Sequence, residues 1–470
     1  MNRFRLFISN FFVYGLGGII GKIIPLIMLP LVTRLMPDTT YFGLNDISTI
    51  IISFGSSIAI MGMYDAMFRM FFEREDLLFK KEICSSALFF TVVTSVLVFM
   101  VMLLFRNFWA EIFFGSKEYA RLLDVSAMSV LVGATNSIVS APTRINNQRK
   151  VYLITNFLSS LISYGISIPL LLNGWYILAL PLAAFISALS IELVFLFLNK
   201  KWFSIKLINL EYTSQMLKVA LPLMPNFLIY WIFNSADRLM LAEMLGNQAV
   251  GVYAIGAKIG QISQLIYTAF AGGWQYFSFS TMKDQDQVKM TSNIFEYLGS
   301  IAFCAGIMMA TLCNWFFRIL FTGEYQRGAI VAPYLFLSPL LLMLFQIGCN
   351  QFLIIKKTWP NLLILSGGAV LNIVLNFIFI PILGIEGAAV ATLAGYVVSD
   401  VICVIVLTKM RLLCISLRFR LITLSSAIFL ILWRLVFQHY EVISIILGTC
   451  LCCIILFSYR NDVRRLFYRQ

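Results

Sequence analysis

Two short stretches, RLMPDTTYFGL at residues 34–44 and AEMLGNQAVGV at residues 242–252, interrupt an otherwise apolar chain at corresponding places. Each stretch joins one long hydrophobic segment to the next. They are offset by 208 residues, and Gly43 matches Gly251. This correspondence predicts that the chain arose by duplication.

A second pair of landmarks supports the duplication. Ile168-Pro169 ends one hydrophobic segment, and Ile380-Pro381 ends another 212 residues later. Each repeat then holds six hydrophobic segments, an even number, so both repeats enter the membrane in the same sense and are related by an axis along its normal. We expect two six-helix lobes facing each other across a central cleft, with two helices appended. The predicted boundaries are 1–199 and 214–408 for the lobes, and 409–470 for the last two helices and a cytoplasmic tail.

The composition is that of a polytopic, all-α membrane protein. Of the 470 residues 60% are hydrophobic and only 12% are charged, and the mean hydropathy is +0.89. A spanning helix needs roughly 20 apolar residues. The first segment is too long for a signal peptide and is expected to stay in the mature protein. About fourteen windows qualify, with 12 or 13 spans as the alternatives: 8–32, 44–63, 83–105, 122–143, 150–172, 175–198, 214–236, 248–272, 294–317, 329–352, 361–382, 386–408, 420–438 and 441–459.

The basic residues are distributed unevenly between alternate loops. With the N-terminus inside, the inward loops and tails hold 25 of the 35 Lys and Arg residues, the outward loops hold 7, and three lie within spans. Lys and Arg near short loops stay on the cytoplasmic side, so both termini are predicted to be cytoplasmic. The net charge of +13 is then explained by topology and by contact with anionic membrane lipids, without nucleic acid.

The sequence offers little for catalysis. The nine cysteines lie mainly in predicted spans without metal-site spacing, and His439 is the only histidine. The acidic triplet at 284–286 is adjacent to basic residues and is typical of a solvated turn. We predict no catalytic residue, no metal site and no cofactor, and hence no enzyme.

Charged residues inside the predicted spans are the best candidates for function. A charge near the bilayer centre costs about 2.5–3.5 kcal/mol on insertion scales, so it needs a partner, water or a role. Lys22 lies just past the middle of the first span, and Lys258 lies near the middle of the eighth, each on a stripe of small and polar residues. We predict that both line the cleft and bind an anionic substrate.

Weaker candidates lie at the ends of the spans. Arg34 and Arg238 sit where the first and seventh spans leave the membrane, and Arg144, Arg149 and Lys150 form a basic turn after the fourth. Guanidinium groups bind phosphate bidentately, although positive-inside loops produce such clusters without any function.

Five further residues are candidates for gating or ion coupling. One is Asp237, which precedes Arg238. Glu192 and Asp400 place carboxyl groups in the last span of each lobe. Pro25 and Pro222 lie in the first span of each lobe, where a proline removes a hydrogen bond and favours a kink. Arg434, near the outer end of the thirteenth span, is expected to extend its charge to the interface.

The chain resembles the Wzx-type polysaccharide flippases of the multidrug/oligosaccharidyl-lipid/polysaccharide exporter superfamily. The matching segments are LPLVTRLMPDTTYFGL at 29–44, LPLMPNFLIYWIFNSADRLMLAEMLGNQAVGVYAIGAKI at 221–259 and LNIVLNFIFIPILGIEGAAVATLAGY at 371–396. The resemblance implies a MATE-like fold in the bacterial inner membrane. It also implies translocation of undecaprenyl-diphosphate-linked oligosaccharides for O-antigen, capsule or exopolysaccharide, with a polymerase and chain-length machinery as partners.

Two other functions stay open at this point. A MATE-like, cation-coupled exporter of drugs or small molecules would be expected to carry carboxylates in its first helix, and the first span has none. The carboxyl groups of Glu192 and Asp400 are the features that support this alternative. A structural membrane protein would leave the mid-span charges without a purpose.

The topology predicts which loops a membrane-impermeant thiol reagent reaches. In a cysteine-free background, single cysteines at residues 173–174 and 383–385 should react in intact cells. Cysteines within 199–213 should react only after permeabilisation, because basic loops are retained inside. Reaction of the 199–213 positions in intact cells would contradict this orientation.

Overall fold

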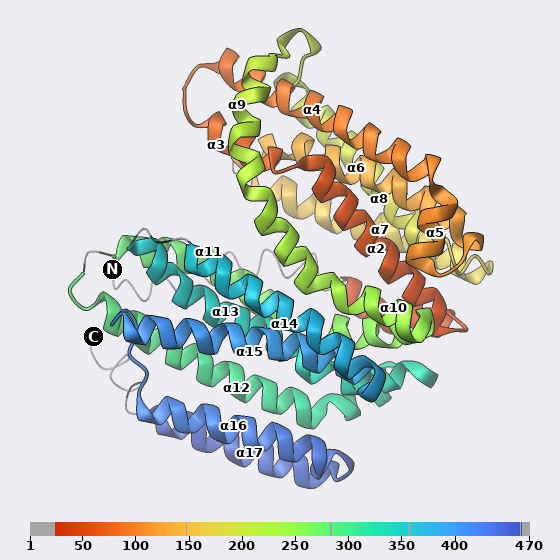
Figure 1. The fold of residues 1–470 in the computed structure, drawn as a ribbon. Coiled ribbons are helices and arrows are strands. Elements are labelled where there is room, and N and C mark those ends of the chain that lie inside the picture. The colour runs from red at the N-terminus through yellow and green to blue at the C-terminus, as the bar shows by residue number, and fades with distance from the viewer. Residues whose placement is uncertain are drawn as a thin grey trace. The chain divides into compact units, whose positions relative to one another are not determined.

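The protein folds into helices in every part that the computed structural model describes, namely residues 24–146, 148–282, 284–355, 357, 359–460 and 462 (Figure 1). This confirms the all-α class. After an apolar helix at Ile24–Leu35, the α-helices are α2 (Thr39–Ile60), α3 (Met63–Phe71), α4 (Leu77–Leu104), α5 (Arg106–Phe114), α6 (Ala120–Ile145), α7 (Arg149–Leu172), α8 (Ala179–Asn199), α9 (Leu210–Ala220), α10 (Met224–Gly260), α11 (Ser263–Ser280), α12 (Gln287–Leu320), α13 (Ala332–Ile354), α14 (Trp359–Leu383), α15 (Ile385–Lys409), α16 (Leu417–Leu435) and α17 (Glu441–Ser458). Short 3₁₀ turns are η1 (Lys117–Tyr119), η2 (Lys200–Trp202), η3 (Ile205–Leu207), η4 (Leu221–Leu223), η5 (Gly323–Ile330) and η6 (Phe437–His439).

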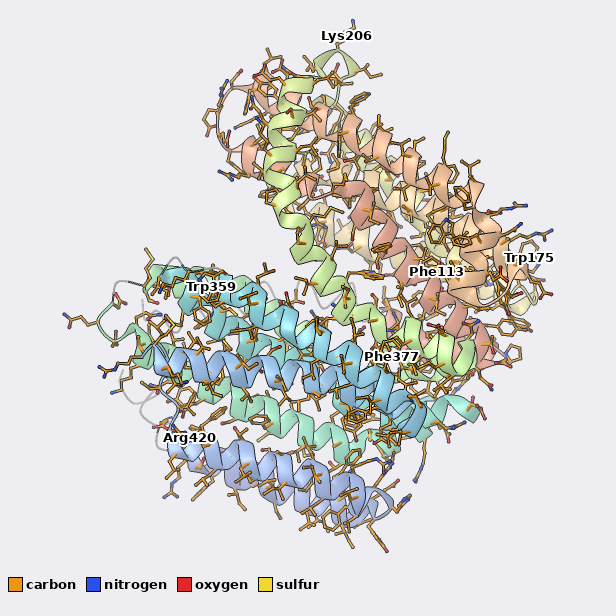
Figure 2. The ribbon with its side chains drawn as sticks, in the orientation of Figure 1. Phe113, Trp175, Lys206, Trp359, Phe377 and Arg420 are labelled. Atoms are coloured by element: carbon orange, nitrogen blue, oxygen red, sulfur yellow. The ribbon has the colours of Figure 1, made fainter. Side chains whose placement is uncertain are left out.

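The helices have the length and apolar surface of membrane spans. Ten helices in the described ranges are long and apolar enough to cross a bilayer, and each of the fourteen predicted windows overlaps a helix. Large apolar side chains point outward: Trp359 and Phe377 of α14 are 63% and 60% exposed (Figure 2). The protein is therefore a multi-pass membrane protein, and the count of fourteen spans stays a prediction.

Local sequence signals fix several helix ends. Asp38 accepts a hydrogen bond from the backbone N–H of Thr40 at 2.7 Å at the start of α2. Asp76 caps the first turn of α4, accepting from Leu78 N at 3.1 Å. Side-chain oxygens in such positions satisfy backbone donors that have no partner within the helix.

The described chain packs as two compact units that divide after Gly251. We call residues 24–251 the N-terminal unit and those from Val252 onward the C-terminal unit. In the N-terminal unit α6 packs against α2, α4 and α8, and α7 pairs with α8. The central position of α6 explains why 61% of its most apolar stretch is buried, against 11% for the peripheral α7.

The C-terminal unit repeats this arrangement. Its central helix is α13, which is 83% buried over its most apolar stretch and packs against α11, α12 and α15, while α14 pairs with α15. The helices α16 and α17 are additional and pack against α12 (Figure 1). The central helices α6 and α13 correspond to the fourth and tenth predicted windows, so their equivalent roles support the duplication. The boundaries at 199, 214 and 408 stay predictions.

The landmark stretches of the two repeats pack against each other within the N-terminal unit. A Cβ added at Gly43 would overlap the carbonyl oxygen of Asn247 and lie 2.9 Å from Gly251 N. A Cβ added at Gly251 would overlap the carbonyl oxygen of Thr39 and lie 3.2 Å from Gly43 N. Thr39 and Asn247 differ by the same 208 residues, so the contact between the two landmark stretches is reciprocal.

The landmark stretch of the second repeat, residues 242–252, contains a break in α10. Gly246 has φ 83° and ψ 171°, a backbone conformation that only glycine adopts without strain. It separates two helical parts of α10, Met224–Leu245 and Asn247–Gly260. The break lies where the sequence predicts the turn between the seventh and eighth spans.

The uncharged turn and the basic loop that flank α8 lie at opposite ends of this helix. Trp175 in the short turn before α8 and Lys206 in the basic loop after it appear at opposite ends of the N-terminal unit (Figure 2). This placement is the one that the predicted topology requires, and the cytoplasmic assignment of the basic end stays a prediction.

The reciprocal glycine contact can be tested by Gly43→Ala. The added methyl group has no room between the α2 and α10 backbones, and overpacking of this kind typically costs about 1–3 kcal/mol. The matched control is Gly165→Ala in α7, where a Cβ meets nothing within 4 Å. We expect a lower thermal unfolding temperature in detergent for Gly43→Ala only, and equal temperatures for both variants would contradict the close approach.

Candidate functional site

Lys258 is exposed on a stretch of α10 that is otherwise buried. Residues 250–257, 259 and 260 are all buried in the packing of the helices, whereas Lys258 is not. Within the described part of the chain Lys258 forms no ion pair. Gln261 and Thr268 are exposed further along the chain, but Gly251 and Ala254 are buried. The predicted polar stripe is therefore reduced to Lys258, Gln261 and Thr268.

The other predicted residues of the first span are only partly described. Lys22 lies outside the described residues. Pro25 and Arg34 are exposed on the helix Ile24–Leu35, with Arg34 one residue from its end. Pro222 lies in the η4 turn between α9 and α10, so the predicted window 214–236 is two helices joined by a 3₁₀ turn rather than one kinked helix.

Arg238 forms a buried ion pair that joins α10 to α2. Its Nε lies 2.8 Å from Oδ2 of Asp46, and the two side chains are only 9% and 7% exposed. The guanidinium also donates to the carbonyl oxygen of Asn234. Asp237 is buried beside it, with its carboxylate 3.9 Å from Arg238 Nη1 and accepting from Arg238 N. Arg238 is thus compensated by carboxylates, and Asp46 was not identified from the sequence.

Further contacts extend this seam between α2 and α10. The indole N–H of Trp231 donates to Ser53 Oγ at 3.2 Å, and the Trp231 ring lies 4.4 Å from that of Phe54, centroid to centroid. Thr39 Oγ1 donates to the carbonyl oxygen of Gln248 at 3.3 Å. Both helical parts of α10 are therefore attached to α2, the first through Trp231 and the second through Gln248.

The two predicted acidic residues occupy different environments. Glu192 of α8 is buried with Thr135 of α6 as a polar neighbour, although the Thr135 hydroxyl itself donates to the carbonyl oxygen of Leu131 at 3.0 Å. Asp400 of α15 is 8% exposed, and neither of its carboxyl oxygens has a hydrogen-bond partner in the described part of the chain. A buried carboxyl group without a partner is costly, so Asp400 is the more unusual of the two.

Arg434, in the last turn of α16, pairs with a carboxylate that no sequence pattern indicates. Its guanidinium binds Glu386 of α15 in bidentate fashion, with Nη2 2.6 Å from Oε2. The hydroxyl of Tyr334 donates to the same carboxylate at 2.8 Å, and Arg434 also donates to Gln438 at 2.8 Å. This network holds α16 against α15 and α13.

An apolar groove of about 770 Å³ runs beside this network in the C-terminal unit. Its walls come from α12, α13, α15 and α16. Asp400, Arg420 and Arg434 are among the few polar side chains in an otherwise aliphatic and aromatic lining.

No group of three or more His, Cys, Asp or Glu side chains in the described ranges is arranged to hold a metal ion. All nine cysteines are free thiols, most of them buried. The predicted absence of a metal site and of a cofactor stays a prediction.

The sequence of this chain matches the model of a known protein family. The model of a family described as "Polysaccharide biosynthesis protein" matches residues 7–274, more than half of the chain. The chain belongs to the polysaccharide biosynthesis protein family. This membership confirms the resemblance that the motifs indicated.

Solved structures with the same fold include transporters and a flippase. The lipid II flippase MurJ in an inward closed conformation superposes with a TM-score of 0.72 at 15% identity, over 96% of this chain and 100% of that one. An inward-facing multidrug resistance MATE family transporter of the MOP superfamily has a TM-score of 0.67 at 14% identity, over 83% and 94%. A MATE transporter of Vibrio cholerae has a TM-score of 0.60 at 14% identity, over 87% and 98%. The MATE-like fold is confirmed.

A curated relative of this family member is an uncharacterized membrane protein of Methanocaldococcus jannaschii. The two are 29% identical over 170 residues, which cover 35% of this chain and 33% of the relative. The match thus spans about a third of the length of that relative.

The buried ion pair gives a stability prediction. Asp46→Asn leaves Arg238 as a buried charge without its nearest carboxylate, and breaking a buried pair costs about 3–5 kcal/mol. We expect a marked drop in the unfolding temperature in detergent, partly restored by adding Arg238→Gln. The control, Asp124→Asn, breaks the exposed 3.4 Å pair with Arg106, which contributes about 1 kcal/mol or less. Equal effects of the two single substitutions would contradict the account of the seam.

Proposed function

We propose that this protein is a flippase that moves undecaprenyl-diphosphate-linked oligosaccharide units from the cytoplasmic to the outer leaflet of the bacterial inner membrane. The units would then be polymerised into a surface polysaccharide. Membership of the polysaccharide biosynthesis protein family supports this function, and so does the fold shared with a lipid II flippase. In this proposal the protein catalyses no bond change, and both termini are cytoplasmic.

The exposed Lys258 is the observation that carries the proposal. An ammonium group facing lipid would cost about 2.5–3.5 kcal/mol, and the surrounding residues of α10 are buried in protein. We infer that the face with Lys258, Gln261 and Thr268 borders a polar cavity. A fixed cation in a partly desolvated cavity attracts a diphosphate strongly, because the effective dielectric constant there is lower than in water.

The remaining predicted residues have supporting roles in the proposal. Lys22 is assigned the same phosphate-binding role as Lys258, and Arg34 a weaker one. Arg238 is better assigned to positioning α10 through Asp46 and Asp237, because its charge is compensated by these carboxylates. Pro25 and Pro222 stay candidates for bending during transport. The apolar groove suits a lipid chain in the chemistry of its lining.

A cation-coupled exporter of drugs or small molecules is the second candidate. Asp400 favours it, because a buried carboxyl group without a described partner is suited to binding a proton or a cation. Glu192 has Thr135 as a polar neighbour and is the weaker candidate for the same role.

The proposed function predicts that Lys258→Gln abolishes surface glycan while lipid-linked units accumulate in the membrane. Lys258→Arg should retain part of the activity, because it keeps the charge with a different shape. The matched control is Lys218→Gln, which changes an exposed lysine on α9, and should leave surface glycan unchanged. The measurements are surface polysaccharide, lipid-linked intermediates and protein abundance in cells that depend on this gene.

Normal surface glycan in the double variant Lys22→Gln, Lys258→Gln would overturn the cationic-site assignment. Loss of both glycan export and drug tolerance in Asp400→Asn alone would favour the exporter instead.

A further inference from the structure

A second cationic feature lies outside the proposed cavity, at the end of the N-terminal unit that holds α3 and the turn between α6 and α7. Arg144, in the last turn of α6, lies between Tyr64 of α3 and Tyr152 of α7. Its guanidinium carbon is 4.8 Å from the centroid of the Tyr152 ring and 5.9 Å from that of Tyr64. Nη1 donates to the hydroxyl of Tyr64 at 3.5 Å and Nη2 to that of Tyr152 at 3.4 Å. Three helices thus converge on one exposed guanidinium.

The charge of Arg144 is not compensated in the described part of the chain. None of the ion pairs found there includes Arg144. Arg418 provides the contrast: it lies 3.8 Å from the centroid of the Tyr459 ring but also pairs with Asp462 at 2.8 Å. Arg144 has the aromatic support without the carboxylate.

The geometry leaves Arg144 able to bind an anion. A guanidinium has five N–H donors in a planar fork, and only two bonds to the tyrosine hydroxyls are formed. The two rings restrict the side chain by cation–π contact and by stacking, so less side-chain entropy is lost when a ligand binds. Lys150, exposed in the first turn of α7, adds a second positive charge six residues along the chain. A doubly anionic group suits this arrangement better than a single carboxylate.

We propose that Arg144, held by Tyr64 and Tyr152, is a capture site for the diphosphate of the lipid-linked substrate at the cytoplasmic surface. This inference rests on the proposed function and on the predicted orientation, which place the basic α6–α7 turn at the level of the inner headgroups. The substrate would meet Arg144 before it reaches Lys258. The same chemistry could be supplied by an anionic phospholipid headgroup, so the test must separate the two sources.

The test is binding of farnesyl diphosphate, a short polyprenyl diphosphate, to the full-length protein in phosphatidylcholine nanodiscs with and without phosphatidylglycerol. Removing a charge-assisted, bidentate contact should weaken binding about tenfold in Arg144→Gln. Arg144→Lys should weaken it by a smaller factor, because the charge stays but the fork is lost. The matched control is Arg106→Gln, an exposed arginine that pairs with Asp124, which should bind like the wild type. Unfolding temperatures confirm that each variant is folded.

Each outcome has a defined meaning. Wild-type affinity in folded Arg144→Gln would overturn the capture site and leave the proposed function standing on Lys258. If phosphatidylglycerol removed the difference between wild type and Arg144→Gln, Arg144 would be a phospholipid contact and the inference would be wrong. If the wild type failed to bind farnesyl diphosphate at all, the proposed function would fail, and the capture site with it.

Discussion

A charged side chain is stable within the hydrocarbon layer only if it has a partner or is in contact with water. Among the ionisable residues of the described spans, this constraint distinguishes three situations. Arg238 and Arg434 are paired with Asp46 and Glu386, and these pairs join helices. Asp400 is buried without a described partner. Lys258 is the one exposed residue of the stretch 250–260 of α10, and in the proposed function it borders a polar cavity.

The duplication explains why the paired charges and the close glycine contact lie where they do. Gly43 packs reciprocally with Gly251 in the second helical part of α10, and α10 up to Gly251 belongs by contact to the N-terminal unit although it begins the second repeat. The Arg238–Asp46 pair and the Trp231 contacts hold the same helix against α2. The break at Gly246 lets the chain change direction directly beside this contact. A short stretch of sequence thereby connects the two repeats.

The sequence allowed the fold to be predicted further than the site. Apolar windows and matched landmarks locate the long helices, because both depend on local composition and spacing, but the windows 214–236 and 248–272 each run across a break between two helices. Neither signal shows which residues form ion pairs. Asp46 lies in the third turn of α2 and Glu386 in the first turn of α15, and only the packing of the helices shows that an arginine lies opposite each carboxylate. The partner of Arg434 was missed for this reason. Pro222 was assigned to a helix, but the chain forms a 3₁₀ turn there, since the window average does not detect a short interruption.

The central claim is that a lipid-linked diphosphate crosses the membrane through this protein. The most direct measurement uses proteoliposomes containing a fluorescent polyprenyl-diphosphate oligosaccharide in both leaflets, with a membrane-impermeant glycosidase added outside. If the account is right, the purified protein should expose the inner-leaflet pool to the glycosidase, whereas protein-free vesicles should keep it protected. The account would be contradicted if the glycosidase did not reach the inner-leaflet pool in vesicles whose protein still transports a cationic drug.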